Sequence, residues 1–391
     1  MNKSRILDAT GLTLACGVAV AGAVRAWQKG MANEPEWAYH KAAASTIFEG
    51  GLSVHNPGYL PGFSALMRPF FLLSEGVGLA LFIALALVAS WFLFRLVWRE
   101  CAQLAPEMRR TPGAWHWVWF AAPLYFAIQN NQVMTQMMLF VVIGFLLLRS
   151  GRWVWGASAL SLSVAIKTFP ITLGLYLLLK RRWREAITFG VLAGATTVLL
   201  GSLVYGPAES IDLHLAWPGK VGGQEPANLL RGEEPRFFDD NQSVAAWIVR
   251  AAPWIGSTTA LVVRYAMFWG SLLITAYAYL RSRTSSKKAR GDLHWDDLAL
   301  WIAWIVFASP FGRYYYAVML LPAWVRLTHP GGPRPEGSLA PRHVIAHALP
   351  LLAWGARSDG VYPIVCALTF LLILRHVWTR GEVEGPQLDA S

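Results

Sequence analysis

Charged residues and cysteines are both scarce in this chain of 391 residues. Only 15% of the residues are charged and 55% are hydrophobic, whereas soluble domains have about 25% charged and about 45–50% apolar residues. Three cysteines are too few for a disulfide framework, and we expect Cys16 and Cys366, which lie in apolar stretches, to be small buried residues. The composition excludes a disordered protein, a coiled coil and a disulfide-rich secreted domain, and it predicts a polytopic membrane protein.

Motifs for nucleotides and metals are also missing from the sequence. It has no glycine-rich phosphate loop, no cluster of Cys and His at metal-ligand spacing, and no clear internal repeat. We therefore expect neither a cofactor nor a metal ion.

Twelve apolar stretches are candidates for spanning or partial membrane helices, since about 20 residues cross the hydrocarbon core. They are Ala9–Val24, Val77–Phe94, Ala114–Ile128, Val133–Leu148, Trp153–Ile166, Phe169–Leu179, Ala186–Tyr205, Thr259–Leu280, Leu298–Phe311, Tyr314–Val325, Val344–Ala356 and Val361–Trp378. No clear small-residue cleavage site precedes Arg25, so we interpret the first stretch as an uncleaved anchor. The sequence predicts an all-α membrane protein with a single domain over residues 1–391.

The distribution of Lys and Arg orients this chain, whose net charge is +11. With the N-terminus inside, basic residues fall in every loop predicted to be cytoplasmic, and they include Lys180, Arg182 and Arg326. Topology thus accounts for the positive charge, and nucleic acid is excluded as a partner. We predict a multi-pass protein of the inner (plasma) membrane with both termini cytoplasmic, including a tail over residues 379–391.

The opposite, extracytoplasmic face then carries two long loops, residues 28–76 and 206–253. An amphipathic helix along the interface is predicted in the first loop. Its apolar side would be formed by Trp37, Tyr39, Ala43, Ile47 and Phe48, and its polar side by Glu36, His40 and Lys41.

Polar residues gather at this same predicted face, at the ends of several spans. They are Glu34, Glu36, Asn130, Asn131, Gln132, Lys167, Asp239, Asp240, Asn241, Gln242, Arg313, Tyr314, Tyr315 and Tyr316. Asn130–Gln132 also fit an ordinary turn, and Glu36 also fits a solvated helix face. A lysine at a helix centre costs about 2.5–3.5 kcal/mol in a membrane, so Lys167 indicates a helix break, an anion site or both. Arg313 either extends to a lipid headgroup or binds an anion.

Five short motifs, in this order, resemble those of glycosyltransferase family 87. The first loop carries Glu36 followed by Phe48-Glu49-Gly50-Gly51 and by Pro57-Gly58-Tyr59-Leu60-Pro61-Gly62. Downstream come Asn131-Gln132-Val133, Lys167-Thr168-Phe169-Pro170, Asn241-Gln242-Ser243, and Ser309-Pro310 with Leu321-Pro322. The resemblance covers most of the chain, from about residue 10 to residue 330.

The resemblance implies a GT-C-like fold with extracytoplasmic amphipathic helices. It also implies transfer of a sugar, most often mannose, from a polyprenyl-phosphate donor on the extracytoplasmic face. The partners would be that donor, a lipid-linked or glycan acceptor, and membrane lipids. The catalytic Asp of the family falls on Glu36, and a His that commonly follows the Ser-Pro motif falls on Tyr315.

These residue types suit such a reaction, because a carboxylate can accept the acceptor's proton and cations can stabilise the departing phosphate. We assign Glu36 as the base of an inverting displacement, with Lys167 and Arg313 as candidate phosphate ligands. The further donor-binding candidates are Tyr315, Asn131, Gln132, Asn241 and Gln242, and the secondary candidates are His40, Asp240 and Tyr59. The alternatives are a lipid or polyisoprenoid transporter, which inverted repeats and midplane charges would favour, and a catalytically silent relative acting in envelope assembly.

Overall fold

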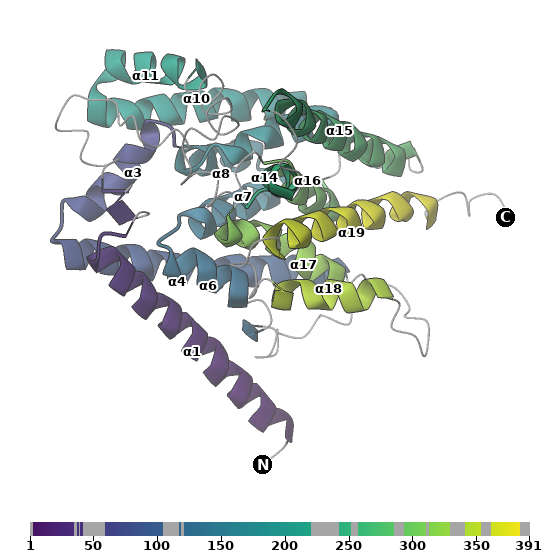
Figure 1. The fold of residues 1–391 in the computed structure, drawn as a ribbon. Helices are drawn as coiled ribbons and strands as arrows, with labels where there is room; N and C mark the ends of the chain where they lie inside the picture. Colours follow the sequence, from purple (N-terminus) through teal and green to yellow (C-terminus); the bar gives the residue numbers. More distant parts are fainter. Residues whose placement is uncertain are drawn as a thin grey trace.

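The structure is a computed structural model, and in the residues that it describes it contains helices and their connections without any strand (Figure 1). The described residues are 3–34, 37–38, 40–41, 59–104, 117–118, 121–219, 242–251, 257–284, 293–309, 313–328, 341–352 and 361–383. The principal helices are α1 (Lys3–Met31), α3 (Gly62–Phe71), α4 (Glu75–Leu104), α6 (Ala121–Gln129), α7 (Met134–Arg149), α8 (Trp153–Ile166), η2 (Phe169–Thr172), α9 (Leu173–Leu179), α10 (Trp183–Tyr205), α11 (Pro207–Gly219), α14 (Val244–Ala251), α15 (Ser257–Thr284), α16 (Trp295–Ala308), η5 (Tyr314–Leu320), α17 (Leu321–Thr328), α18 (Pro341–Leu352) and α19 (Val361–Val383).

In the described residues, each of the twelve predicted stretches overlaps a helix or a pair of consecutive helices. Parts of three stretches, residues 114–116, 119–120, 310–311 and 353–356, lie outside the described residues. Among the described residues, four helices are long and apolar enough to cross a membrane: α1, α4, α10 and α19. The shorter apolar helices include α7 and α8. An all-α protein with membrane helices is therefore confirmed, while the number of spans and the GT-C architecture remain predictions. Helix α19 runs to Val383, so the tail predicted to begin at residue 379 begins inside a helix.

Helix α1 leaves the body of the bundle toward its N-terminus (Figure 1). Only 18% of its most apolar window is buried inside the protein, and Cys16 on it is exposed. The prediction of a buried Cys16 is therefore wrong, because an apolar helix that faces lipid exposes its small residues too. Cys366, in contrast, is buried as predicted.

Helices α7 and α8 pack closely because each carries a glycine at the contact. A Cβ atom at Gly144 would lie 3.0 Å from the carbonyl oxygen of Gly156, and one at Gly156 would lie 2.9 Å from that of Gly144. Small residues allow such close backbone approach between membrane helices. This pair brings the α6–α7 and α8–η2 connections to the same end of the bundle.

Helix α11, within the predicted second loop, turns back along α10 (Figure 1). Gly206 joins the two helices at φ 82°, a left-handed conformation that glycine adopts without steric cost. The Ser210 hydroxyl then donates to the Val198 carbonyl oxygen at 2.9 Å. The loop therefore begins with a helix packed on the bundle.

Tryptophan-rich α16 forms the centre of the other half of the molecule, where it packs against α15, α17 and α19. All its residues from Trp295 to Val306 are buried. The Trp304 indole N–H donates to the Ser271 hydroxyl of α15 at 3.0 Å. Helix α16 is thus surrounded by protein, which the prediction of an ordinary membrane span did not anticipate.

A buried ion pair lies at the N-terminal end of α16. The Lys180 ammonium group is 2.6 Å from Asp297 Oδ2, and both side chains are 1% exposed. The Tyr279 ring centroid is 4.4 Å from Lys180 Nζ. Lys180 does lie in the predicted loop, between α9 and α10, but it is buried there because the carboxylate supplied by α16 draws it into the bundle.

Two further buried carboxylates at this end form ion pairs. Arg326 Nε is 2.5 Å from Asp296 Oδ1, and His376 Nε2 is 3.2 Å from Asp296 Oδ2. Glu100 of α4 pairs with Arg149 at the end of α7. Arg326 was predicted to be a loop cation, and this is wrong, because it lies buried within α17. We call the part of the molecule that holds these three carboxylates, Asp296, Asp297 and Glu100, the ion-pair end.

Removing one partner of the buried pair should be strongly destabilising. Asp297→Asn leaves Lys180 buried without its compensating charge, and breaking such pairs costs about 3–5 kcal/mol. We expect a clear fall in the melting temperature of the detergent-solubilised protein. The double variant Lys180→Met/Asp297→Leu, which removes both charges, should recover most of the loss. Wild-type melting of Asp297→Asn would contradict a structural role of the pair.

Candidate functional site

The connection between α6 and α7 is a tight turn built from carboxamide residues, and we call Asn130, Asn131 and Gln132 the amide turn. Asn131 has φ 51°, in the left-handed region that Asn tolerates better than most residues. The N–H groups of Asn131 and Gln132 donate to carbonyl groups of α6 at 2.9 and 3.0 Å. The predicted turn chemistry is confirmed, and it places all three side chains at the end opposite the ion pairs.

The side chain of Asn130 ties this turn to distant parts of the chain. Its Oδ1 atom accepts hydrogen bonds from Lys29 Nζ at 3.1 Å and from the Tyr314 hydroxyl at 3.1 Å. The Tyr314 backbone N–H donates to Gln242 Oε1 at 3.0 Å. Helices α1, α6 and η5 therefore meet at the Asn130 carboxamide, and Gln242, before α14, joins them through Tyr314.

The amide turn and the first turn of α7 also contain unsatisfied polar atoms. Six buried side-chain atoms lack a hydrogen-bond partner among the described residues: Gln129 Nε2, Asn131 Oδ1, Gln132 Oε1, Thr135 Oγ1, Gln136 Nε2 and Gln136 Oε1. Each such buried group costs about 1–3 kcal/mol. Polar groups of this kind are suited to hold a polyhydroxylated ligand or ordered water.

Sequence reasoning selected Asn131 and Gln132 but missed Gln129, Thr135 and Gln136. The signal was present in the sequence, since five amides within eight residues interrupt two apolar stretches. It was passed over because an amide beside a turn has an ordinary local explanation.

Lys167 lies where α8 ends, and its backbone is extended at φ −159° and ψ 140°. The predicted helix break is therefore confirmed, with a short 3-10 helix beginning at Phe169. The residue is only 5% exposed. Its ammonium group lies 4.9 Å from the ring centroid of Tyr59, 4.9 Å from that of Tyr316 and 5.7 Å from that of Phe169. A desolvated cation gains about 2 kcal/mol or more from such a contact.

A run of three tyrosines connects Lys167 to the amide turn. Tyr314 bonds Asn130, as described above, and the Tyr316 ring faces Lys167. Tyr315 lies between them, 5% exposed, with ring centroids 5.7 and 5.1 Å from its two neighbours. The lysine and the amides are therefore separated by no more than three consecutive residues of η5.

Arg313 immediately precedes this run and has an extended backbone. Its guanidinium carbon lies 6.0 Å from the Tyr315 ring centroid, and the residue is half-buried. Both cations selected from the sequence thus lie beside the tyrosine run.

His40 was predicted to lie on the polar side of an interfacial helix, and this is wrong. Its side chain is fully buried, and Nε2 is 2.9 Å from the Asn131 carbonyl oxygen. Its ring centroid is 5.9 Å from that of Tyr59, 5.4 Å from that of Phe63 and 5.7 Å from that of Phe82. Helices α3 and α4 cover this side of the segment, which a pattern within one segment cannot reveal.

The residues around His40 differ in their burial. Trp37 is 1% exposed, with its ring centroid 4.7 Å from that of Phe71. Lys41 is exposed and forms an ion pair with Glu75 at 3.0 Å. The described part of this segment therefore packs on the bundle and presents only Lys41 outward.

The structure thus brings together most of the described candidates. Direct contacts join Lys167 to Tyr59, Arg313 to Tyr315, and Asn131 to His40. Gln132 and Gln242 join the same region through the amide turn and Tyr314. Three candidates, Glu36, Asp240 and Asn241, lie outside the described residues. Within the described ranges, no group of three or more His, Cys, Asp or Glu side chains is arranged to hold a metal ion.

Comparison with known protein families finds one family whose model matches this chain. A family described as Glycosyltransferase family 87 matches residues 58–295, which is more than half of the chain. The match includes the amide turn, Lys167, Tyr59 and Gln242, and it ends before the tyrosine run. Comparison with curated proteins and with solved structures finds no match.

Proposed function

We propose that this chain, which belongs to glycosyltransferase family 87 and is accordingly a membrane glycosyltransferase, uses a polyprenyl-phosphate sugar as its donor. The observation that carries the proposal is a buried lysine among aromatic rings, next to a turn rich in unsatisfied amides. The lysine is suited to bind a phosphate group, and the neighbouring amides are suited to bind a sugar. We further propose a GT-C architecture and transfer of a neutral hexose, with mannose as the first candidate.

The proposed phosphate ligand is Lys167. A lysine ammonium group binds phosphate as a compact point charge, and its position at a helix break allows the backbone around it to leave helical geometry. The rings of Tyr59 and Tyr316 hold the cation without neutralising it. Arg313, at the start of the tyrosine run, is the proposed second cation.

The proposed sugar ligands are the carboxamides of the amide turn with Gln242 and Asn241. A carboxamide both donates and accepts hydrogen bonds, as the hydroxyl groups of a sugar do. The unsatisfied atoms of Gln132 and Asn131 support this role. Tyr315, Tyr59 and His40 would shape the walls of the site.

In the proposed reaction, a hydroxyl group of a lipid-linked or glycan acceptor attacks C1 of the sugar from the face opposite the phosphate. The new C1–O bond forms as the C1–O bond to phosphate breaks, and the electron pair leaves with the phosphate. Glu36 accepts the hydroxyl proton, with Asp240 as the alternative base. Lys167 and Arg313 stabilise the growing phosphate charge. One displacement of this kind inverts the anomeric configuration.

The proposed site faces the extracytoplasmic side of the inner membrane. This orientation is supported by the concentration of Arg and Lys in short loops at the other end of the helices, because such basic loops are typically cytoplasmic. Arg152, Arg181 and Arg184 are exposed at that end. Both termini would then be cytoplasmic.

The first prediction concerns the base. Glu36→Gln keeps the shape of the side chain but removes its ability to accept a proton, and general-base catalysis contributes about 10²–10⁴-fold. We expect turnover of a polyprenyl-phosphate sugar to fall by that factor, while binding of the donor changes little. The assay follows transfer of radiolabelled sugar to membrane acceptors.

Glu75→Gln is the matched control, because Glu75, the first residue of α4, pairs only with the exposed Lys41 among the described residues. It should retain nearly full activity. Normal turnover by Glu36→Gln would exclude Glu36 as the base, and Asp240→Asn would then be measured.

The second prediction concerns the phosphate ligand. Lys167→Met keeps the length of the aliphatic chain but removes the charge, and hydrogen bonds to charged groups contribute about 1.5–3 kcal/mol. We expect kcat/KM for the donor to fall about 10- to 100-fold, with Lys167→Arg retaining part of the activity. If Lys167→Met instead melts at a lower temperature and uses the donor normally, the lysine has a purely structural role.

A further inference from the structure

Two connections at the ion-pair end have the same backbone geometry. In residues 150–152, between α7 and α8, and in residues 180–182, between α9 and α10, the middle residue has a positive φ. That residue donates a hydrogen bond three residues back in the chain, and the next residue donates five residues back. This pattern is the Schellman motif, which normally uses glycine at the left-handed position. We call these two connections the arginine turns.

The left-handed position differs between the two turns. It is Gly151, with φ 79°, in the first and Arg181, with φ 57°, in the second. A non-glycine residue pays a steric penalty in this conformation, and the second turn nonetheless presents an exposed arginine there. Backbone geometry alone would favour glycine at both positions.

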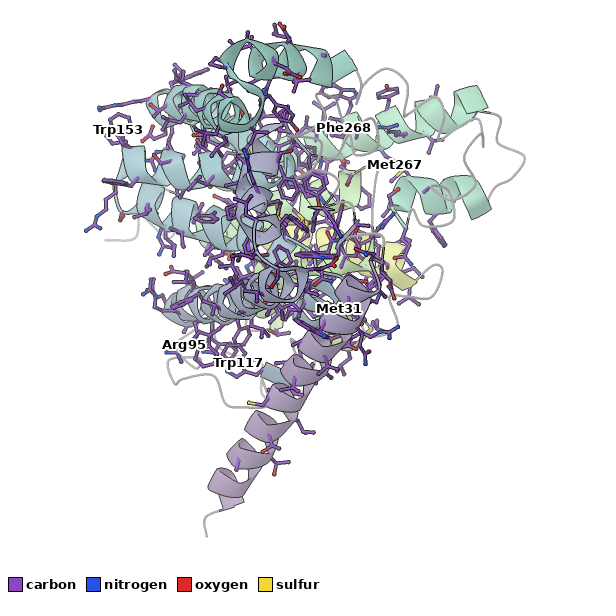
Figure 2. The ribbon with its side chains drawn as sticks, turned by 90° about the vertical axis from the view of Figure 1, so that its left-hand side faces the viewer. Met31, Arg95, Trp117, Trp153, Met267 and Phe268 are labelled. Carbon is purple, nitrogen blue, oxygen red and sulfur yellow. The ribbon has the colours of Figure 1, made fainter. Side chains whose placement is uncertain are left out.

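The two turns lie side by side. The Arg182 guanidinium group donates to the Leu148 carbonyl oxygen at 3.4 Å. The Arg184 guanidinium carbon lies 3.9 Å from the ring centroid of Trp153, the first residue of α8. Figure 2 shows Trp153 at the margin of the molecule, on the same side as Arg95 and Trp117.

The arginines of these turns divide into paired and unpaired groups. Arg182 forms an ion pair with Glu185 at 2.6 Å. Arg152, Arg181 and Arg184, the last in the first turn of α10, are exposed. None of them has a carboxylate within ion-pair distance in the part of the chain that the structure describes. Three positive charges without a described counter-charge therefore gather on the two turns and on the adjoining start of α10.

Large apolar side chains border this charge. Trp155 is 71% exposed and Trp183 is 59% exposed. Farther along α10, Ile187 and Val191 are 63% and 64% exposed. Tryptophan is typical of the membrane–water interface, so the arginines lie at headgroup level and the apolar surface of α10 lies at the level of the acyl chains.

We propose that the arginine turns bind the phosphate group of an anionic phospholipid, with its acyl chains along the exposed face of α10. The positive charge complements an anionic headgroup, and the adjoining apolar surface complements an acyl chain. A free anion has no acyl chain and would leave that apolar surface unused. Basic sites at the cytoplasmic side of membrane helices are suited to such headgroups. This site lies at the end opposite the proposed catalytic site, and its existence does not depend on the proposed reaction.

The test uses the full chain purified in dodecyl maltoside micelles. Phosphatidylglycerol or phosphatidylcholine is titrated in, and bound lipid is counted by native mass spectrometry while the melting temperature is recorded. A lipid that binds the folded state raises the melting temperature. We expect phosphatidylglycerol to bind and stabilise, and phosphatidylcholine to do so far less.

The variants separate charge from structure. An arginine near an anionic membrane surface strengthens the binding of anionic lipid. We therefore expect Arg152→Gln or Arg184→Gln to weaken phosphatidylglycerol binding about fivefold. Arg181→Gly is the sharper variant, because glycine relieves the left-handed strain. In lipid-free detergent this variant should have a higher melting temperature than the wild type. Added phosphatidylglycerol should nevertheless raise its melting temperature by less than it raises that of the wild type. Arg375→Gln, an exposed arginine on α19, is the matched control and should bind as the wild type does.

Three outcomes would overturn the proposal. The first is equal stabilisation by phosphatidylglycerol and phosphatidylcholine. The second is an effect of Arg375→Gln on phosphatidylglycerol binding as large as that of Arg184→Gln. The third is stabilisation by inorganic phosphate as large as that by phosphatidylglycerol, since the ligand would then be a free anion.

Discussion

The burial of the Lys167 ammonium group among three aromatic rings is the interaction on which the candidate site depends. A buried cation is costly unless its surroundings compensate it, and here the rings of Tyr59, Phe169 and Tyr316 lie within 6 Å of it. These rings come from three separate segments, so the α8–η2 break, the start of α3 and η5 must converge. The same tyrosine run reaches the amide turn through Tyr314. One contact set therefore fixes the positions of the proposed phosphate and sugar ligands together.

The two ends of the bundle differ in whether their buried polar groups have partners. At the ion-pair end, Lys180 and Arg326 each meet a carboxylate at 2.5–2.6 Å, so buried charge is compensated and the helices are held in register. At the other end, amide groups lack partners among the described residues. Unsatisfied polar groups lower stability, so their concentration in eight residues favours a functional explanation over a structural one. Stability is thus assigned to the ion-pair end, and the proposed binding of the sugar donor to the opposite end.

Much of the fold followed from hydrophobic stretches alone, because a membrane helix is specified mainly by its length and apolar content. The break at Lys167 was predictable because a charged residue and Pro170 interrupt an apolar run. The amide turn was predictable from its residue types. Ion pairs between residues far apart in the sequence were not predictable. Asp297 lies 117 residues from Lys180, and no local sequence pattern relates them. The burial of His40 was missed for the same reason, since the helices that cover it belong to other segments.

The most direct test of the account is a structure of the full chain with a bound polyprenyl-phosphonate sugar, in which the phosphonate replaces the cleavable phosphate. The account predicts phosphonate oxygens at about 2.7–2.9 Å from Lys167 Nζ, a charge-assisted hydrogen-bond distance, with the sugar against Asn131 and Gln132. A phosphonate bound away from Lys167, with the amide turn unoccupied, would contradict it.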